Sequence, residues 1–494
     1  MRRGRRGPNL NWQLIVPVVS GALLAVGLGM LACCVVGLTG GDGEALAFGA
    51  PAAVVIPLAA LGVASARRLP STPLRARDGF FAVTAAWVAA AAAGAVPFLL
   101  ADTFERPLDA LFESMSGFTT TGATLLAEIE PEPDAILLWR SISQWLGGVG
   151  IVVLVVAIAP ATGLAAQRVF FAETSGVTAE RLTPRIADTA KIIWGIYLTL
   201  TAAGFLAYLI AGMSPFEAIN HIFTTLATGG FSTRTASIAG FDSLAIELVA
   251  IFFMTAAGVN FAFYWRALRG KAIWPQAAEV RLYLLIIAGS IAAVTLSHAL
   301  NDQDGGIWQN LRESAFSVTS IITTTGYTTA EFDDWNDYAR AHLLLLMFVG
   351  GCAGSTAGGM KVIRVLLLAK TAGQEAQRQL RPKAVQVLRT RGRVFSEEVR
   401  RGVLGFFCIY MIVTFVATFA MLASGLDLIS AFSSVAATLN VIGPGVGQVG
   451  ATDNYEAVSD GGRVFLTALM LVGRLEVFTV FVLLTPAFWR PNVA

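Results

Sequence analysis

The fold is decided by four short segments that align on a glycine: Thr120-Thr121-Gly122-Ala123, Thr228-Gly229-Gly230-Phe231, Thr324-Thr325-Gly326-Tyr327 and Val441-Ile442-Gly443-Pro444. One ungapped register serves all four, because a small residue lies twelve positions before each glycine. These small residues are Ala110, Ala218, Ser314 and Ala431. The stretch between each of them and its glycine is compatible with a short helix. A single Thr-Thr-Gly is unspecific, since membrane helices are rich in such residues. Four copies in one register indicate an internal repeat.

Each segment lies between two long apolar stretches. Crossing a bilayer core of about 30 Å takes about 20 apolar residues in a helix. The chain has 494 residues, of which 55% are hydrophobic and 14% charged, so we predict an all-α polytopic membrane protein. The first helices of the repeats are expected at about 78–101, 189–212, 275–300 and 400–424, and the second at about 135–160, 243–268, 337–371 and 462–488.

The inserts between the paired helices are too polar and too rich in glycine to span a bilayer. They cover 107–134, 214–240, 308–335 and 427–458. Irregular backbone at membrane depth is tolerated only where protein buries it or a water-filled cavity adjoins it. The sequence therefore predicts four re-entrant pore loops, with pseudo-fourfold symmetry around one axis.

Two further helices, at about 13–38 and 44–66, precede the repeats. The predicted units are the N-terminal helix pair (1–70), repeat 1 (71–165), repeat 2 (166–270), repeat 3 (271–390) and repeat 4 (391–494). Only the second helix of repeat 3 is expected to be clearly broken.

Charge alternates along the chain in the way that orients membrane proteins. The N-terminus is basic, and so are segments 161–188, 266–281 and 361–401, whereas the opposite loops are acidic, as at 128–134 and 331–337. Basic loops stay in the cytoplasm. We therefore expect a cytoplasmic N-terminus and an acidic outer face that concentrates cations. Segment 361–401 is either a docking surface for a partner or a basic anchor.

The third segment, Thr-Thr-Gly-Tyr-Thr, is close to the Thr-Val-Gly-Tyr-Gly of potassium channel filters. A dehydrated K⁺ ion needs a ring of oxygens in place of its water, and backbone carbonyls supply one. Aiming successive carbonyls at one axis requires backbone angles that glycine adopts at low cost. A helix C-terminus pointing at that axis adds partial negative charge. The candidate filter residues are Thr120, Thr121, Gly122, Thr228, Gly229, Gly230, Thr324, Thr325, Gly326, Val441, Ile442 and Gly443.

A second candidate site is the glycine-rich stretch in the second helix of repeat 3. Five glycines in ten residues cannot hold a stable helix, at about 1 kcal/mol lost per Gly relative to Ala. The stretch is Gly350, Gly351, Cys352, Ala353, Gly354, Ser355, Thr356, Ala357, Gly358 and Gly359. Charges inside an apolar helix are usually functional or paired, and the last helix carries Arg474 and Glu476. A structural Arg474–Glu476 pair is the alternative to a role in the pore, although positions i and i+2 face different sides of a helix.

The chain resembles the pore subunits of the Trk-type potassium transporters, in the Trk/Ktr/HKT superfamily. The resemblance covers all four repeats and is carried by segments such as 112–124, 322–329, 350–361 and 473–479. The N-terminal helix pair favours the Trk branch. In this family the segment 350–360, with Lys361 beside it, is an intramembrane loop that obstructs the pore. The resemblance also implies that Arg474 faces the cavity and the loop.

Further expectations follow from the same resemblance. It implies a potassium preference over sodium, since sodium-conducting plant members tend to carry Ser at the position of Gly122. Val441 departs from the Thr of the other repeats, and the absent hydroxyl is expected to weaken one ion site. The resemblance further implies a homodimer in the bacterial inner membrane, with a cytosolic ring of regulatory subunits that bind a nucleotide (ATP/ADP or NAD).

We also expect contact with membrane lipid, no nucleic acid, and no cofactor in this chain apart from the transported K⁺. A symporter that couples K⁺ to H⁺ or Na⁺ entry remains the alternative. An alternating-access transporter would need inverted repeats, whereas these repeats share one orientation. No convergent nucleophile, base or metal set predicts an enzyme. We interpret His221 and His342 as structural.

Overall fold

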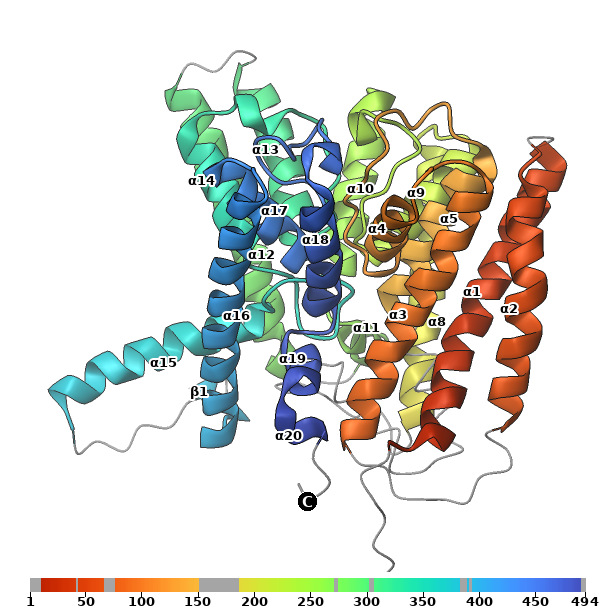
Figure 1. Cartoon of the computed structure of the whole chain (residues 1–494). Helices are drawn as coiled ribbons and strands as arrows, with labels where there is room; N and C mark the ends of the chain where they lie inside the picture. Colours follow the sequence, from red (N-terminus) through yellow and green to blue (C-terminus); the bar gives the residue numbers. More distant parts are fainter. Residues whose placement is uncertain are drawn as a thin grey trace, which may run out of the picture.

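The computed structural model describes residues 10–40, 43–65, 76–150, 186–270, 274–301, 306–382, 389–390 and 393–489. Two antiparallel helices come first and pack along one side of the bundle (Figure 1). They are α1 (Trp12–Gly40) and α2 (Ala45–Ser65). Both are apolar around most of their circumference, as expected of helices that face lipid as well as protein. The predicted N-terminal pair is therefore confirmed, and α1 connects it to repeat 1 by packing on α3.

The predicted order of long helix, short pore helix and second helix recurs four times. Repeat 1 has α3 (Ala76–Leu100), α4 (Pro107–Phe118), α5 (Asp134–Trp145) and the π-helix η2 (Leu146–Gly150). Repeat 2 has α8 (Ile186–Ile210), α9 (Pro215–Ala227), the 3₁₀ turn η4 (Ser237–Phe241), α10 (Leu244–Ala257) and α11 (Phe261–Leu268). The four pore helices α4, α9, α13 and α17 lie in the same half of the bundle (Figure 1).

Repeats 3 and 4 follow the same plan. Repeat 3 has α12 (Trp274–Leu300), α13 (Gly306–Ile322), η5 (Phe332–Asp334), α14 (Asp337–Leu346) and α15 (Val362–Leu380). A two-residue hairpin of β1 (Arg389–Thr390) and β2 (Arg393–Val394) precedes repeat 4. Repeat 4 has α16 (Glu397–Ala423), α17 (Leu428–Leu439), η6 (Tyr455–Ala457), α18 (Asp460–Arg474), α19 (Phe478–Leu484) and α20 (Pro486–Trp489). The predicted unit boundaries all fall in, or at the edge of, stretches outside the described residues.

Side-chain caps begin the pore helices α9 and α17, and also α14 and α18, which follow pore loops. Ser214 and Glu217 form a reciprocal capping box at the start of α9, with Pro215 at its first position. Asp427 accepts backbone N–H groups from Ile429 and Ser430 at the start of α17. These caps satisfy donors that a short helix would otherwise leave unpaired in a protein interior. In repeats 2 and 4 they fix the residue at which the pore helix begins.

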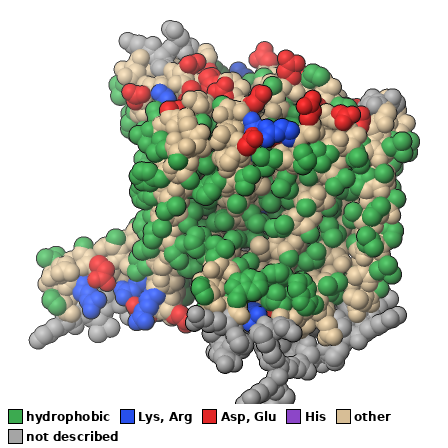
Figure 2. Space-filling view, viewed as in Figure 1, with side chains coloured by type: hydrophobic (Ala, Val, Ile, Leu, Met, Phe, Trp, Pro, Cys, Tyr) green, Lys and Arg blue, Asp and Glu red, His purple; other side chains and the backbone are tan. Residues whose placement is uncertain are grey.

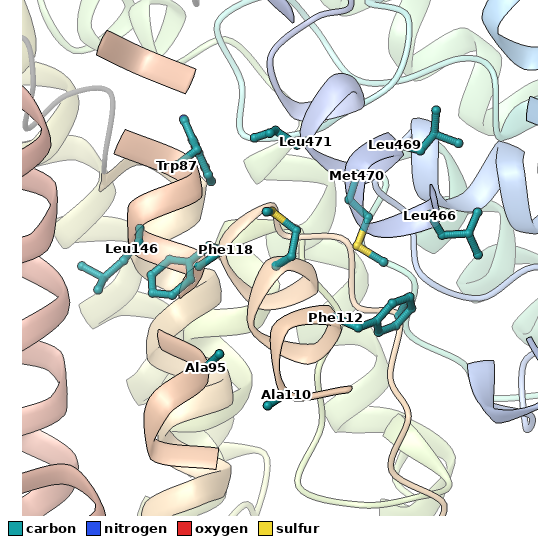
Figure 3. Packing of buried hydrophobic residues seen from close by; sticks show 14 of the residues in the cluster. Trp87, Ala95, Ala110, Phe112, Phe118, Leu146, Leu466, Leu469, Met470 and Leu471 are labelled. Atoms are coloured by element: carbon teal, nitrogen blue, oxygen red, sulfur yellow. The ribbon is translucent and has the colours of Figure 1, made fainter. Parts of the chain in front are cut away.

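Three apolar clusters hold the pore helices in place. Figure 3 shows Phe118 and Phe112 of α4 among Trp87 and Ala95 of α3, Leu146 of η2 and several residues of α18. A methyl group on Gly94 would come within 3.0 Å of the Phe118 ring, so α3 and α4 approach closely because that side chain is absent. The pore helix of repeat 1 is thus fixed by its own repeat and by repeat 4.

The surface divides into an apolar belt between two charged ends. In Figure 2, acidic side chains gather at the end that carries the pore-helix loops, and the Lys and Arg side chains of α15 lie at the opposite end. Within the described residues, six helices are long and apolar enough to cross a membrane: α1, α2, α3, α8, α12 and α16. Two bent pairs, α10 with α11 and α18 with α19, raise that number to eight if each is one span.

The expectation of a single broken helix is wrong. The predicted helix 243–268 bends by 91° between α10 and α11. Asn260 caps the new helix by accepting the Ala262 N–H, and a Cβ on Gly258 would come within 3.0 Å of the Tyr283 hydroxyl. The predicted helix 462–488 bends by 118°, where Glu476 and Val477 adopt φ of 55° and 46°. A β-branched residue such as Val477 is rarely left-handed, so the second break does not follow from local preference alone.

Candidate ion-selectivity site

All four pore helices end with the same backbone motif. Two residues before each aligned glycine the chain turns left-handed, with φ of 58° at Thr120, 54° at Thr228, 56° at Thr324 and 54° at Val441. In repeat 1, Thr120 N–H donates to Gly117 O at 2.9 Å and Thr121 N–H donates to Ser116 O at 2.8 Å. The other three repeats make the equivalent pair of bonds. This is the Schellman arrangement, in which glycine normally supplies the left-handed residue.

A threonine or valine in the left-handed region is strained, by about 1–3 kcal/mol for each residue. Four such residues at equivalent positions require that the surrounding protein holds them there, and strain of this kind clusters at functional sites. Val441 has the same backbone conformation as the three threonines. The fourth segment therefore makes the same left-handed turn as the other three, whereas the sequence predicts a weakened ion site there.

The aligned glycines bring the four segments into a closed ring. Their φ values are 81° at Gly122, 81° at Gly230, 79° at Gly326 and 102° at Gly443. A methyl group on any of them would come within 3.0 Å of a carbonyl oxygen in a neighbouring repeat. The pairs are Gly122 with Gly229 O, Gly230 with Thr325 O, Gly326 with Ile442 O, and Gly443 with Thr121 O. The contacts run from repeat 1 to 2, 3 and 4 and back to 1, so the structure places all twelve predicted filter residues together.

A pocket of about 90 Å³ lies on one side of this ring. It is lined by Gly122, Gly326 and Gly443 and by residues that follow the filter segments, among them Thr124, Ser232, Thr328 and Pro444. Asp453, Arg140 and Arg234 also contribute to its wall. We call it the outer pocket, because it lies on the side of the pore-helix loops. Its small volume suits one or a few water-sized species above the ring.

Two tyrosine hydroxyls connect the ring to the surrounding protein. Tyr455 donates from its hydroxyl to Gly443 O at 2.7 Å, and Tyr327 bonds through its hydroxyl to the carbonyl of His221 at 3.1 Å. The ring of His221 binds Ser232 Oγ through Nε2 at 3.0 Å, in agreement with a structural histidine. Tyr455 lies in the loop before α18, outside the aligned segments, so no sequence pattern marked it.

The glycine-rich loop, residues 347–361 between α14 and α15, fills the break in the third repeat. Groups of the loop form hydrogen bonds with the break between α10 and α11, and the two ends of the loop bond to each other. The bonds to repeat 2 are Cys352 N–H to Gly258 O at 2.8 Å, Phe261 N–H to Gly354 O at 3.1 Å and Thr356 Oγ1 to Ala257 O at 3.2 Å. Irregular backbone at membrane depth must be satisfied by protein or water. The backbone groups that the two breaks leave free form hydrogen bonds with each other, which explains why both helices can break.

A carboxylate on α12 also fastens the loop. Glu279 is buried and accepts the backbone N–H groups of Ala353 at 2.8 Å and Ile363 at 3.3 Å. One side chain thus holds both the middle of the loop and the start of α15. At the far end, Gly350 N–H donates to Met360 O at 3.0 Å, which closes the neck of the loop. The sequence did not mark Glu279, because its partners are backbone groups more than 70 positions away.

The loop lies directly against the filter, on the side opposite the outer pocket. Gly358 N–H donates to Thr324 Oγ1 at 2.7 Å. A methyl group on Gly358 would come within 3.0 Å of Val441 Cγ2 and Asn440 O. The left-handed residues of repeats 3 and 4 therefore contact the loop itself. At this end of the ring, Val441 offers an apolar surface to Gly358 in place of a hydroxyl.

Arg474 joins the loop to the filter of repeat 1. Its Nη1 donates to Thr120 Oγ1 at 3.1 Å and to Thr356 O at 3.0 Å. Its Nη2 donates to the carbonyls of Gly147 and Gly148, at 2.6 Å and 2.7 Å, within the π-helix η2. Lys361 is also buried, and its Nζ donates to Ala357 O. Two cationic groups thus converge on the loop and the inner end of the ring.

Glu476 has a partner other than the one weighed from the sequence. It binds Arg364 on α15, with 2.5 Å between Oε2 and Nη2. The Arg364 guanidinium also lies 4.0 Å above the ring of Phe406 on α16. The ion pair ties α15 to the break between α18 and α19. The alternative of an Arg474–Glu476 structural pair therefore gives way to a longer-range connection, made at the position where Glu476 is left-handed.

Comparison with known proteins identifies the family. The sequence profile of the TrkH family, described as "Cation transport protein", matches residues 52–490. The Trk system potassium uptake protein TrkH of Vibrio parahaemolyticus is 40% identical over 487 residues, which is 97% of this chain and 100% of that protein. The TrkH of Escherichia coli K12 is 41% identical over 421 residues, or 84% of this chain and 87% of that protein.

A solved structure agrees with these relatives. The crystal structure of the potassium transporter TrkH from Vibrio parahaemolyticus superposes with a TM-score of 0.87 and 38% identity, over 97% of this chain and all of that one. The predicted architecture of a helix pair followed by four pore repeats is thereby confirmed, as is the expectation of a transporter in place of an enzyme. From its profile match, its relatives and its fold, the chain belongs to the TrkH family of cation transport proteins.

Proposed function

We propose that the chain is the membrane pore of a bacterial potassium uptake system and that the ring of four filter segments selects the ion. The observation that carries this proposal is the repeated left-handed residue and glycine in each segment, closed in cyclic order by the contacts of the four glycines. Successive carbonyls around one axis replace the hydration shell of K⁺. The relatives are potassium uptake proteins of the Trk system, which supports the same ion.

The driving force needs no chemical step in this chain. An inside-negative membrane potential contributes about 2.3 kcal/mol per elementary charge for each 100 mV. Passive conduction at that potential concentrates K⁺ by a factor of tens. Coupling of K⁺ entry to H⁺ or Na⁺ is the alternative proposal, and it would extend that range.

We further propose that the glycine-rich loop is the gate. Gly350, Gly351, Cys352, Ala353, Gly354, Ser355, Thr356, Ala357, Gly358 and Gly359 form the obstruction, with Lys361 and Arg474 beside them. Support comes from the contacts of Gly358 with repeats 3 and 4 and of Arg474 with Thr120 and Thr356. A loop in this position blocks the inner end of the ring sterically. The neighbouring cations add an electrostatic barrier to a passing K⁺ ion.

The assembly around the pore is proposed on the family resemblance and on charge. We infer an inner-membrane location with a cytoplasmic N-terminus, a homodimer, and a cytosolic ring of regulatory subunits that bind the nucleotide. The basic end of α15, opposite the acidic loops, supports this orientation (Figure 2). Domain boundaries at 70, 165, 270 and 390 remain part of the same proposal.

A flux measurement tests the function. The full-length protein is reconstituted in liposomes, and Rb⁺ uptake is measured with and without pH and Na⁺ gradients. Growth of an uptake-deficient bacterium at low K⁺ serves as the cellular readout. We expect K⁺-dependent growth rescue and Rb⁺ uptake that follows the membrane potential alone. Uptake that requires a pH or Na⁺ gradient would establish symport, and absence of both rescue and uptake would refute the proposal.

A further inference from the structure

One helix face in repeat 1 supports the filter segment of repeat 2. Arg140 and Gln144 are four residues apart on α5, so they lie one above the other on the same side of the helix. Both side chains are buried, with Arg140 only 1% exposed and Gln144 fully enclosed. Polar groups removed from water to this degree are costly unless they are fully paired. The groups to which Arg140 and Gln144 form hydrogen bonds therefore indicate the role of these two residues.

Gln144 forms hydrogen bonds with the backbone on both sides of the filter glycine Gly230. Its Nε2 donates to Gly229 O at 2.7 Å, and its Oε1 accepts the Phe231 N–H at 3.1 Å. The carbonyl of Gly229 is the one that packs against Gly122 in the ring. A carbonyl oxygen has two lone pairs, so Gln144 orients this oxygen without using its whole accepting capacity.

The same contact explains a difference between the repeats. The position before the aligned glycine is Thr121, Thr325 or Ile442 in three repeats and Gly229 in repeat 2. A methyl group on Gly229 would come within 3.0 Å of the Gln144 side chain. The second glycine of repeat 2 is therefore the counterpart of Gln144, which occupies the space where the other repeats have a side chain.

Arg140 continues the support one helical turn away. Its Nε binds Glu113 Oε1 on α4 at 2.9 Å, and its Nη2 donates to Thr124 Oγ1 at 3.2 Å. Its Nη1 donates to Ser232 O at 3.2 Å, and the guanidinium lies 4.1 Å from the centre of the Phe231 ring. Thr124 and Ser232 both stand two residues after a filter glycine. Arg140, paired with Glu113, thus connects the segments of repeats 1 and 2 at equivalent positions, two residues beyond their filter glycines.

We propose that Arg140 and Gln144 are positioning residues for ion selection, which hold the filter segments of repeats 1 and 2 at a fixed separation. The proposal rests on the filter function proposed above. Selection by a carbonyl ring needs a fixed number and spacing of oxygens around the ion, and a fully satisfied buried network supplies rigidity. Without this support, the ring of repeats 1 and 2 can adapt to the smaller Na⁺, and selectivity falls while conduction continues.

The test compares fluxes of K⁺ (as Rb⁺) and Na⁺ through the reconstituted full-length protein. Gln144→Met keeps the length of the side chain and removes both hydrogen bonds. We expect the K⁺/Na⁺ flux ratio to fall about tenfold, the effect of losing one or two buried hydrogen bonds. Glu113→Gln with Arg140→Gln removes both charges together, because Arg140→Gln alone leaves a buried carboxylate and risks failure to fold. This double variant is expected to lower the ratio as well.

Gln144→Glu provides a readout that a general packing defect would not give. Below its pKa the introduced carboxylic acid can donate to Gly229 O, and above it the carboxylate repels that oxygen. The K⁺/Na⁺ ratio of this variant should therefore recover at pH 5.5 and fall at pH 8, whereas the parent and Gln144→Met change little between the two. These two pH values are chosen to bracket the raised pKa of a buried carboxyl.

The matched control is the ion pair of Arg312 with Glu247. It has two 2.8 Å bonds and joins repeats 3 and 2, but it contacts no filter segment. The double variant Glu247→Gln with Arg312→Gln, which leaves no buried carboxylate, should leave the flux ratio unchanged. Parental ratios in Gln144→Met, Gln144→Glu and the Glu113/Arg140 double variant would overturn the inference. Should the parent itself fail to prefer K⁺, the proposed function fails instead, so the two failures are distinguishable.

Discussion

The backbone N–H of Gly358 donates a 2.7 Å hydrogen bond to Oγ1 of Thr324, which joins the glycine-rich loop directly to the third filter segment. Thr324 is one of the four left-handed residues that end the pore helices. A filter residue and a loop residue 34 positions apart in sequence thus share one bond. Movement of the loop must break this bond, so loop position and filter are coupled.

A side chain at residue 358 should open the pore. Gly358→Val adds atoms where even a methyl group would approach Val441 Cγ2 and Asn440 O within 3.0 Å. We expect the loop to move away from the ring and Rb⁺ flux in liposomes to rise about tenfold, which corresponds to about 1.4 kcal/mol. Deletion of 351–358 should raise flux at least as much. Gly373→Val on α15, where an added Cβ meets nothing within 4 Å, is the control. Unchanged or lower flux in both loop variants would contradict the gate.

Replacement of Arg474 should weaken the closed state. Arg474→Ala removes the donors to Thr120 Oγ1 and Thr356 O, so we expect higher basal Rb⁺ flux. Combined with deletion of 351–358, the substitution should add little further flux, because residues that act through one contact are not additive. Full additivity of the two changes in the same assay would show that Arg474 acts independently of the loop.

Removal of either member of the Arg364–Glu476 pair should destabilise the protein. Both side chains are largely buried, so Arg364→Gln or Glu476→Gln leaves an unpaired charge and should cost about 2–4 kcal/mol. The double variant should lose less than the sum of the two. Thermal unfolding in detergent measures these changes. Arg401→Gln, which removes an exposed partner of Glu397 on α16, should leave the melting temperature within error. Simple additivity would argue against the pair as a connection between α15 and the α18–α19 break.

A serine at Gly122 should relax ion selection. Its side chain would press on the Gly229 carbonyl of the neighbouring repeat, and φ of 81° is unfavourable for a residue with a Cβ. We expect Gly122→Ser to admit Na⁺ in the liposome flux assay. Gly195→Ser on α8 adds the same atoms in open space and should keep the parental K⁺/Na⁺ ratio. Parental selectivity in Gly122→Ser would count against the assignment of this segment to the filter.

Titration of Asp333, which lies at the outer face, should make the free energy of unfolding depend on pH. It lies in the loop before α14, where burial raises the pKa of its carboxyl above 3.8, although the Gly447 N–H that it accepts acts in the opposite direction. An acid with a raised pKa is more protonated when folded than when unfolded. The free energy of unfolding therefore falls as pH rises from the unfolded value through the folded value.

Asp333→Asn removes that titration. Melting temperatures measured between pH 4 and 7 should show the parent losing stability relative to the variant as pH rises. Asp337→Asn removes an exposed charge on the same face but keeps Asp333, so this control should lose stability with rising pH as the parent does. Parallel pH curves for the parent and Asp333→Asn would contradict the raised pKa.

Much of the architecture could be predicted because it depends on the local composition of the sequence. Apolar length located the six unbroken membrane-spanning helices to within a few residues, and the register of Gly122, Gly230, Gly326 and Gly443 located the four segments that close the ring. Their common register reflects a backbone requirement: each glycine has positive φ and contacts a carbonyl of the next repeat. The five glycines of 350–359 likewise predicted the broken helix of repeat 3 from the low helix propensity of glycine.

Other features could not be predicted, because their causes lie in distant parts of the chain. The helix of 243–268 breaks where its freed backbone groups find Cys352, Gly354 and Thr356. The partner of Glu476 is Arg364, 112 positions away and not its neighbour Arg474. The role of Gln144 depends on a carbonyl 85 positions away. None of these pairings leaves a periodic or local signal.

The sequence by itself therefore determined the class of fold, the number of repeats and the filter register, since these follow from hydropathy and from the φ angles that glycine alone adopts at low cost. Only the tertiary structure decided which carbonyl meets which glycine, where the second and fourth repeats bend, and which side chains hold the loop and the ring. The physical reason is that a buried hydrogen-bonding group must find a partner wherever the fold provides one. Such partners are set by packing in space and not by distance along the chain.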